Sequence, residues 1–261
     1  MGLLDVVFRR PVVDFGEYEV LMLITGNVFS WDGRKVRELG GTGSGLCLCI
    51  HNDQLIEGAT GGVLNYNTGE MYEREGFVQA VCSNRGAIYD SVIVCSGGAE
   101  EESIIRVTST NEVVARRRTA VMSLCSHGGL LYDGSHGFEV HETLSGKLVT
   151  EECDANVLCS HKGHLYAGGS MGVIFDVLEG RPVVRREYRI WGMCSLGGRL
   201  YDSSEYGGVY ETLTGRKVLG YGHIKHPRRQ EVTSIGSMIV SENKLLQRFG
   251  DIMRNNHRYH Y

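Results

Sequence analysis

Residues 158–183 read LCSHKGHLYAGGSMGVIFDVLEGRPV, and the fold prediction rests on this segment and its copies elsewhere in the chain. Two further segments align with it: LCSHGGLLYDGSHGFEVHETLSGKLV at residues 124–149 and MCSLGGRLYDSSEYGGVYETLTGRKV at residues 193–218. Weaker copies begin at Leu48, Val81 and Val232, and a seventh is expected over residues 15–39. Because self-similarity at a nearly fixed period is typical of repeat architectures, we expect an array of one small structural unit.

The copies keep a common register. The second residue of the Leu-Tyr pair marks each copy, and the markers are 33, 33, 43, 34, 35 and 39 residues apart. Seven residues before the marker, five copies share a cysteine: Cys49, Cys82, Cys125, Cys159 and Cys194. The two long intervals contain inserts, at residues 96–103 and 222–230. The remaining intervals therefore define one repeating unit.

Within a copy the apolar residues alternate with a period of two, which is typical of strands. In the copy that contains Tyr166, strands are expected over residues 156–160, 164–167, 173–177 and 182–186, with glycine-containing turns between them. The 36 glycines and 3 prolines of the 261-residue chain fit many tight turns between hydrogen-bonded strands. A four-stranded meander repeated about seven times predicts an all-β fold, the β-propeller.

Closure into a ring follows from burial, since a small sheet cannot bury both faces unless it stacks against a neighbour on each side. The last copy supplies three strands, and residues 3–9 are expected to complete it as the missing fourth. The prediction is a single seven-bladed β-propeller of four-stranded antiparallel blades over residues 1–250. Residues 251–261 form a basic, aromatic C-terminal tail.

The repeat resembles those of the WD40, YVTN and quinoprotein-type propeller superfamily. The segment CSHKG at residues 159–163 is similar to their FSPDG turn, and HLYAGGS at residues 164–170 is similar to KLLASGS. The segments ETLSGK at residues 142–147 and ETLTGR at residues 211–216 resemble the D-x-x-TG-K turn of these families. The resemblance implies the propeller fold, while the quinoprotein tryptophans are absent, so quinone binding is not implied.

Charge, hydropathy and cysteine content limit the classes of function to be expected. The chain has 27 Lys and Arg against 31 Asp and Glu, a net charge of −4, which gives no general support for nucleic-acid binding. No membrane-spanning stretch or signal peptide is recognisable, and eight cysteines at this length are not a disulfide scaffold, so a cytoplasmic protein with reduced thiols is expected. The repeat cysteines are expected to pack as small apolar residues on the inner strand, and no cofactor or metal is predicted.

An acidic residue recurs directly after the marker in four copies: Glu57, Asp90, Asp133 and Asp202. If these side chains converge at the mouth of the central channel, they are candidates for acid and base catalysis. The alternative is that each one accepts hydrogen bonds from the backbone of its own glycine-rich turn. The histidines two residues after the repeat cysteine, among them His161, are expected to be solvated turn residues.

The inserts break the repeat and are the places where a rigid ring most readily acquires partner specificity. The predicted partner-binding residues are Glu100, Glu101, Glu102, His223, Lys225, His226, Arg228 and Arg229.

No catalytic motif is recognisable, so the leading hypothesis is a non-enzymatic scaffold that binds a protein or peptide through loops on one face. Two alternatives stay open. One is a small enzyme, a lyase or glycoside-acting hydrolase, that uses the recurring carboxylates. The other is a binder of a small ligand in the central channel or of carbohydrate in equivalent pockets.

Overall fold

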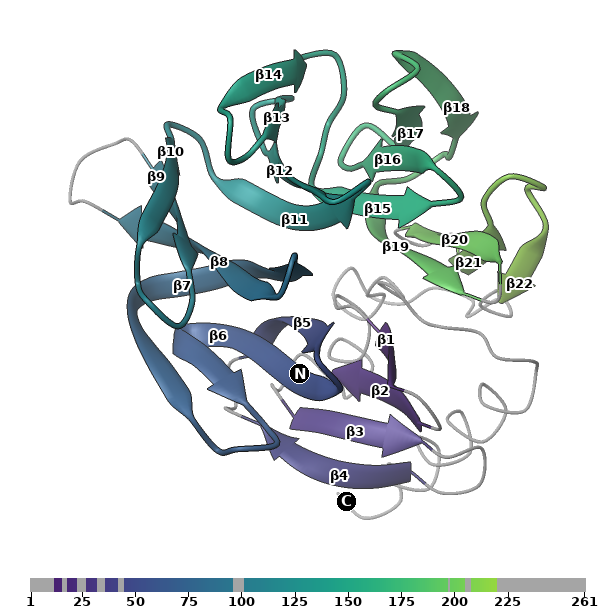
Figure 1. Ribbon diagram of the computed structural model, residues 1–261. Coiled ribbons are helices and arrows are strands. Elements are labelled where there is room, and N and C mark those ends of the chain that lie inside the picture. Colours follow the sequence, from purple (N-terminus) through teal and green to yellow (C-terminus); the bar gives the residue numbers. More distant parts are fainter. Residues whose placement is uncertain are drawn as a thin grey trace, which may run out of the picture.

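The computed structural model describes residues 12–15, 18–22, 27–31, 36–41, 45–95, 101–196, 198–204 and 208–219. These residues form 22 strands in five antiparallel sheets, and this part of the chain contains no helix (Figure 1). The all-β prediction is therefore confirmed for the described ranges.

Four of the sheets are meanders of four strands that pair in chain order. Strands β1 to β4 are Val12–Phe15, Tyr18–Met22, Asn27–Trp31 and Val36–Gly41. Strands β11 to β14 are Val121–His127, Leu130–Ser135, Val140–Glu142 and Lys147–Thr150. Strands β15 to β18 are Val157–His161, His164–Gly168, Val173–Asp176 and Arg181–Arg185. Strands β19 to β22 are Ile190–Leu196, Arg199–Ser204, Gly208–Glu211 and Lys217–Leu219.

The fifth sheet has six strands in the order β10-β9-β8-β7-β6-β5. Strands β5 to β10 are Gly45–His51, Gln54–Asn65, Met71–Asn84, Ala87–Cys95, Glu101–Val107 and Val113–Arg117. It holds two copies of the repeat, because β6 and β7 each continue through positions that belong to two strands elsewhere. The amide of Tyr66, directly after β6, donates to the carbonyl of Leu55 in β6, just as the amide of Thr143, directly after β13, donates to the carbonyl of Leu131 in the separate strand β12.

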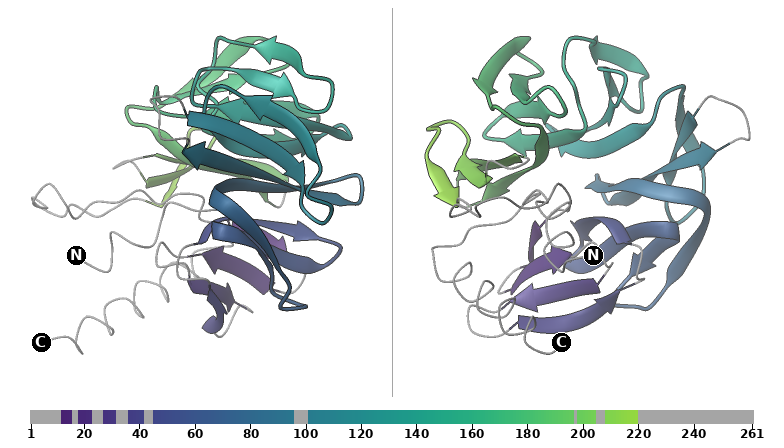
Figure 2. Two further views of the ribbon diagram at one scale, coloured as in Figure 1. Left: turned by 90° about the vertical axis from the view of Figure 1, so that its left-hand side faces the viewer. Right: turned by 180° about the vertical axis from the view of Figure 1, so that it is seen from behind.

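The sheets follow one another in chain order around a central axis (Figures 1 and 2). The first strand of each copy is innermost, so that β11 contacts both β7 and β15, and β15 contacts β19. Radial meanders around a channel are the architecture of a β-propeller. The copy expected over residues 15–39 corresponds to the β1–β4 sheet. The last predicted copy, which begins at Val232, the closing strand at residues 3–9 and the tail at residues 251–261 lie outside the described residues, so seven blades and this closure stay predictions.

The seven-residue spacing from cysteine to marker corresponds to a direct cross-strand pair. Cys125 lies opposite Tyr132, and Cys159 lies opposite Tyr166. The chain reverses between such strands in two residues of positive φ, as at Lys162 (48°) and Gly163 (82°). Turns of this kind match the right-handed twist of the flanking strands, and their positive φ explains why glycine is frequent in them.

The core lies between neighbouring blades. One apolar cluster joins Tyr166 and Ile174 of the β15–β18 blade to Ile190, Met193 and Leu200 of the next. Three repeat cysteines, Cys49, Cys82 and Cys159, belong to such clusters and are each 8% exposed, which confirms the predicted packing role for them. Burial raises the pKa of the Cys82 and Cys125 thiols to about 12, so these groups stay protonated at neutral pH.

Candidate functional site

The repeat histidines are not solvated turn residues. Each ends an inner strand, and its Nδ1 lies within hydrogen-bond distance of a serine hydroxyl on the next copy. The Nδ1–Oγ distances are 2.9 Å for His51–Ser83, 2.9 Å for His127–Ser160 and 2.7 Å for His161–Ser195. Asn84 occupies the same position in its copy and accepts from Ser126 at 2.7 Å. These histidine, asparagine and serine side chains therefore link the inner strands of successive copies into a belt of side-chain contacts.

The recurring aspartates are also linkers between copies. Asp90, Asp133 and Asp202 are at most 1% exposed, and each accepts two hydrogen bonds from an arginine 16 residues earlier. The pairs, with N–O distances of 2.7–2.9 Å, are Arg74–Asp90, Arg117–Asp133 and Arg186–Asp202. The arginine belongs to the outer strand of one copy, or to the segment directly after it, and the aspartate to the second strand of the next. The expectation that the aspartates bond their own turns is therefore wrong, because a neighbouring guanidinium is the better partner.

Glu57 is the fourth carboxylate of this series, and the residue 16 positions before it in the sequence is Gly41 instead of an arginine. It is fully buried and accepts a hydrogen bond of 2.8 Å from the Tyr66 hydroxyl. Burial, together with the nearby Glu57 charge, raises the pKa of Tyr66 above its usual value. None of the four carboxylates lines either of the two cavities described below, and their contacts support a role in holding the copies together.

A second position in this series also departs from the arginine–aspartate pattern. Where the β11–β14 blade meets the β15–β18 blade, Glu151 and Ala167 occupy the positions that hold arginine and aspartate in the three pairs. An apolar group fills the space, with Cys153 4%, Ala167 0% and Phe175 7% exposed. This junction is therefore held by apolar packing instead of a buried ion pair.

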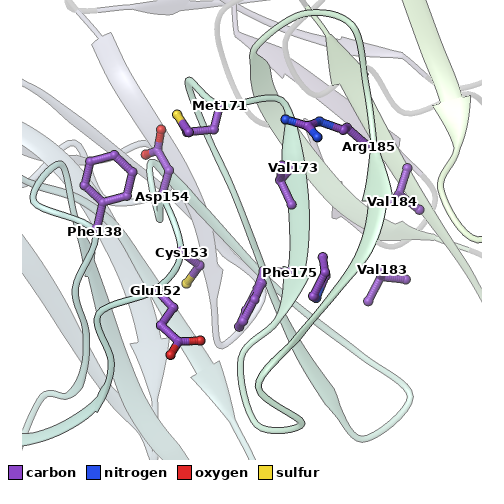
Figure 3. A pocket seen from close by; sticks show the side chains of 11 residues that line it. Phe138, Glu152, Cys153, Asp154, Met171, Val173, Phe175, Val183, Val184 and Arg185 are labelled. Carbon is purple, nitrogen blue, oxygen red and sulfur yellow. The ribbon is translucent and has the colours of Figure 1, made fainter.

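A cavity of about 520 Å³ opens at the same junction (Figure 3). Its walls come from the segment that connects the two blades, from the strands β17 and β18, and from the turns that follow β12 and β16. These turns contribute Phe138 and Met171, which are 40% and 60% exposed. We call this cavity the junction groove. It combines exposed apolar side chains with a few charged ones, which is typical of a binding site.

Asp154 is the buried charged residue of the groove, at 5% exposure. Its Oδ2 accepts hydrogen bonds from the backbone N–H and the hydroxyl of Ser170, while its buried Oδ1 has no hydrogen-bond partner. A Cβ atom at Gly169 would lie only 2.3 Å from the Asp154 carboxyl carbon. The lack of a side chain at Gly169 therefore makes room for this carboxylate.

Phe138 is held in an unusual backbone conformation, with φ of 67°. Its equivalent in the next blade is Gly172, whose φ is 69°. A bulky residue in this left-handed region is strained by roughly 1–2 kcal/mol. The turn therefore keeps an aromatic ring at the groove in a position where glycine is the relaxed choice.

A second cavity, of about 240 Å³, lies in the central channel. It is lined by residues of β5, β11, β15 and β19, of the second half of β7 and of the segment that leads into β15, among them Gln79, Met122 and Trp191. The predicted carboxylates are not part of this lining. A small ligand in the channel stays a prediction.

Among the predicted insert residues, Glu102 has a described side chain. Of the acidic insert, Glu102 pairs with Arg116 at 3.1 Å on the surface of β9 and β10. Glu100, the Glu101 side chain and the basic insert with His223, Lys225, His226, Arg228 and Arg229 lie outside the described residues. Partner binding by these inserts therefore stays a prediction.

The described ranges contain neither a recognisable metal-binding cluster nor a membrane-spanning helix. No three His, Cys, Asp or Glu side chains of these ranges converge as metal ligands would. Within the same ranges, no helix has the length and apolar character needed to cross a membrane.

The junction groove was not predictable from the residues that the copies share. The signal that marks it is departure from the repeat: Phe138 stands in a glycine position, and Glu151 and Ala167 replace an arginine and an aspartate. The arginine partners were recognisable too, as an Arg 16 residues before each recurring Asp.

Comparison with known proteins agrees with this architecture. No family model matches the sequence, and no curated protein matches it. Among solved structures, the computationally designed Ika8 protein is similar, with a TM-score of 0.56 and 14% identity over 92% of this chain and 79% of that one.

Two further similar folds come from structures of complexes. A chain in the mitotic checkpoint complex matches with a TM-score of 0.55 and 14% identity, over 76% of this chain and 72% of its own. A chain in the structure of BBS1N in complex with ARL6DN matches with a TM-score of 0.55 and 14% identity, over 81% of this chain and 80% of its own. Similarity at these identities shows the fold, and the class of protein is the β-propeller.

Proposed function

We propose that this chain is a non-enzymatic propeller scaffold that binds a protein partner, and that the junction groove is the docking site. The single observation that supports it most is the coincidence of three features at one junction. The buried arginine–aspartate pair is absent there, a cavity of about 520 Å³ opens, and the strained Phe138 and the exposed Met171 border it. Strain retained at a surface position is typical of functional sites.

The groove also fits the prediction that one face of the ring carries the site. Phe138 and Met171 belong to turns between second and third strands, and Asp154 belongs to the segment that enters an inner strand. In an antiparallel meander these segments lie at the same edge of the sheet, because the inner strand begins where the second strand ends. The similar folds in the mitotic checkpoint complex and in the BBS1N complex with ARL6DN support partner binding by analogy of fold alone.

The test compares partners recovered by the full-length tagged chain from the cells that express it. Met171→Lys places a charge at the groove, and Leu213→Lys is the matched control, since Leu213 is 52% exposed and does not line the groove. We expect at least one protein to be recovered by wild type and by Leu213→Lys but lost with Met171→Lys, and to bind as a purified protein in calorimetry. Equal recovery by both variants, or no specific protein with wild type, would show that the groove is not a docking site.

A further inference from the structure

We infer that the junction groove recognises a protein segment in which a lysine or arginine is next to an apolar residue, with the cation pairing with Asp154. This inference rests on the proposed function and names the chemistry of its partner.

Asp154 differs from the other buried carboxylates of the described residues. Each of the others has an aromatic hydroxyl or a nitrogen-bearing side chain as partner: Glu57 with Tyr66, Asp90 with Arg74, Asp133 with Arg117, Asp176 with His164, and Asp202 with Arg186.

Asp154 has only Ser170 as a donor, its Oδ1 is buried without a partner, and no basic side chain of the described ranges lies within ion-pair distance. Leaving a buried carboxylate without a cation is costly, so a cation supplied by a partner would satisfy a need that already exists.

The surroundings of Asp154 suit a long basic side chain. The carboxylate lies between the ring of Phe138 and the side chain of Met171 (Figure 3). Both of these side chains are exposed enough to move aside. The alkyl stem of a lysine or arginine packs well on a thioether, and its cation is attracted to an aromatic face.

The remaining charges set the orientation of the segment. Glu152 lies on the same connecting segment as Asp154, whereas the basic Arg185 of β18 lies across the groove (Figure 3). A cation is therefore favoured on the Asp154 side. The apolar neighbour of that cation is expected to pack against Val173 and Phe175, which also line the groove.

The experiment uses a phage library of random 12-residue peptides, selected on the wild-type chain with counter-selection on Met171→Lys. Recovered peptides are synthesised and titrated against wild type, Asp154→Asn, Met171→Glu and Met171→Lys, with Leu213→Glu and Leu213→Lys as matched controls. The Met171 and Leu213 substitutions are at exposed positions, so their outcome does not depend on whether Asp154→Asn folds. Thermal unfolding of every variant is measured first.

We expect the recovered peptides to share a Lys or Arg beside an apolar residue. Replacing that residue by Gln should weaken binding to wild type at least about 10-fold and have little further effect on Asp154→Asn. Met171→Glu should tighten binding about 2- to 5-fold and Met171→Lys should weaken it, with both differences shrinking in high salt. The Leu213 variants should bind as wild type does.

Two other outcomes are distinguishable. If Met171→Glu weakens binding as much as Met171→Lys, or if the recovered peptides lack Lys and Arg, the groove is an apolar docking site and the inference on charge is wrong while the proposed function stands. If no recovered peptide distinguishes wild type from Met171→Lys, both the inference and the proposed function fail.

Discussion

Arg74→Met tests whether the buried arginine–aspartate pairs hold neighbouring copies together. The side chains of Arg74 and Asp90 are 3% and 0% exposed, and two guanidinium nitrogens donate to the carboxylate at 2.9 and 2.8 Å. Arg74 also donates to the carbonyl of Thr108 at 2.8 Å. Removing the guanidinium leaves Asp90 buried with the Thr108 hydroxyl as its one remaining side-chain donor among the described residues.

The expected loss follows from that burial. Removing one member of a buried ion pair costs about 3–5 kcal/mol, because the remaining charge cannot reach water. At about 2–4 °C per kcal/mol for a domain of this size, the midpoint of thermal unfolding should fall by roughly 6–20 °C. Asp90→Asn added to Arg74→Met removes the stranded charge, so the double variant should be less destabilised than the two single losses added together.

The assay is denaturant unfolding followed by circular dichroism and by tryptophan fluorescence, accepted only where the two transitions coincide. The matched control is Arg116→Met on the same sheet, whose ion pair with Glu102 is exposed at 56% and 45% and should contribute about 0.2–1 kcal/mol at most. If Arg74→Met and Arg116→Met lower the unfolding free energy equally, the buried pairs do not hold the copies together, and the reasoning is refuted.

Two further variants test the belt and the groove. Burial lowers the pKa of His161, and Lys162 and His164 lower it further, so the unfolded chain takes up a proton at this site more readily than the folded one. The contribution of His161 should be complete above pH 6.5 and decline as pH falls, and His161→Asn should reduce that decline between pH 7.5 and 5.5 in unfolding measurements. Phe138→Gly should stabilise the fold by about 1 kcal/mol because it relieves the backbone strain at this position. The same substitution should weaken the binding of peptides selected on the wild-type chain several-fold. A loss of stability would show that the Phe138 backbone is not strained.

The strands were predictable because their signals are local. The four strands expected around Tyr166 agree with β15 to β18 to within one residue at each end. Alternating apolar residues and glycine-containing turns determine a meander wherever they occur. The cysteine-to-marker spacing was predictable for the same reason, since a two-residue turn fixes the register of a hairpin.

The partners of the recurring polar residues were not predictable in this way. An aspartate near a glycine-rich turn can bond that turn or a side chain from elsewhere, and the local sequence does not distinguish the two. Only the radial packing of the copies brings Arg117 to Asp133 and His127 to Ser160. The histidines were misjudged for that reason, because a strand end that is exposed in an isolated hairpin is covered by the next copy.

The repeated four-stranded unit, the inner position of its cysteines and the propeller class were all predictable from local sequence patterns, because each depends on short-range periodicity and on the need to bury apolar faces. The arginine–aspartate and histidine–serine contacts between copies, and the junction that lacks the arginine–aspartate pair, depend instead on how the blades pack in three dimensions. The junction groove lies where two neighbouring blades meet with Glu151 and Ala167 at the positions that hold an ion pair elsewhere, and its lining, which includes the buried Asp154, comes from both blades.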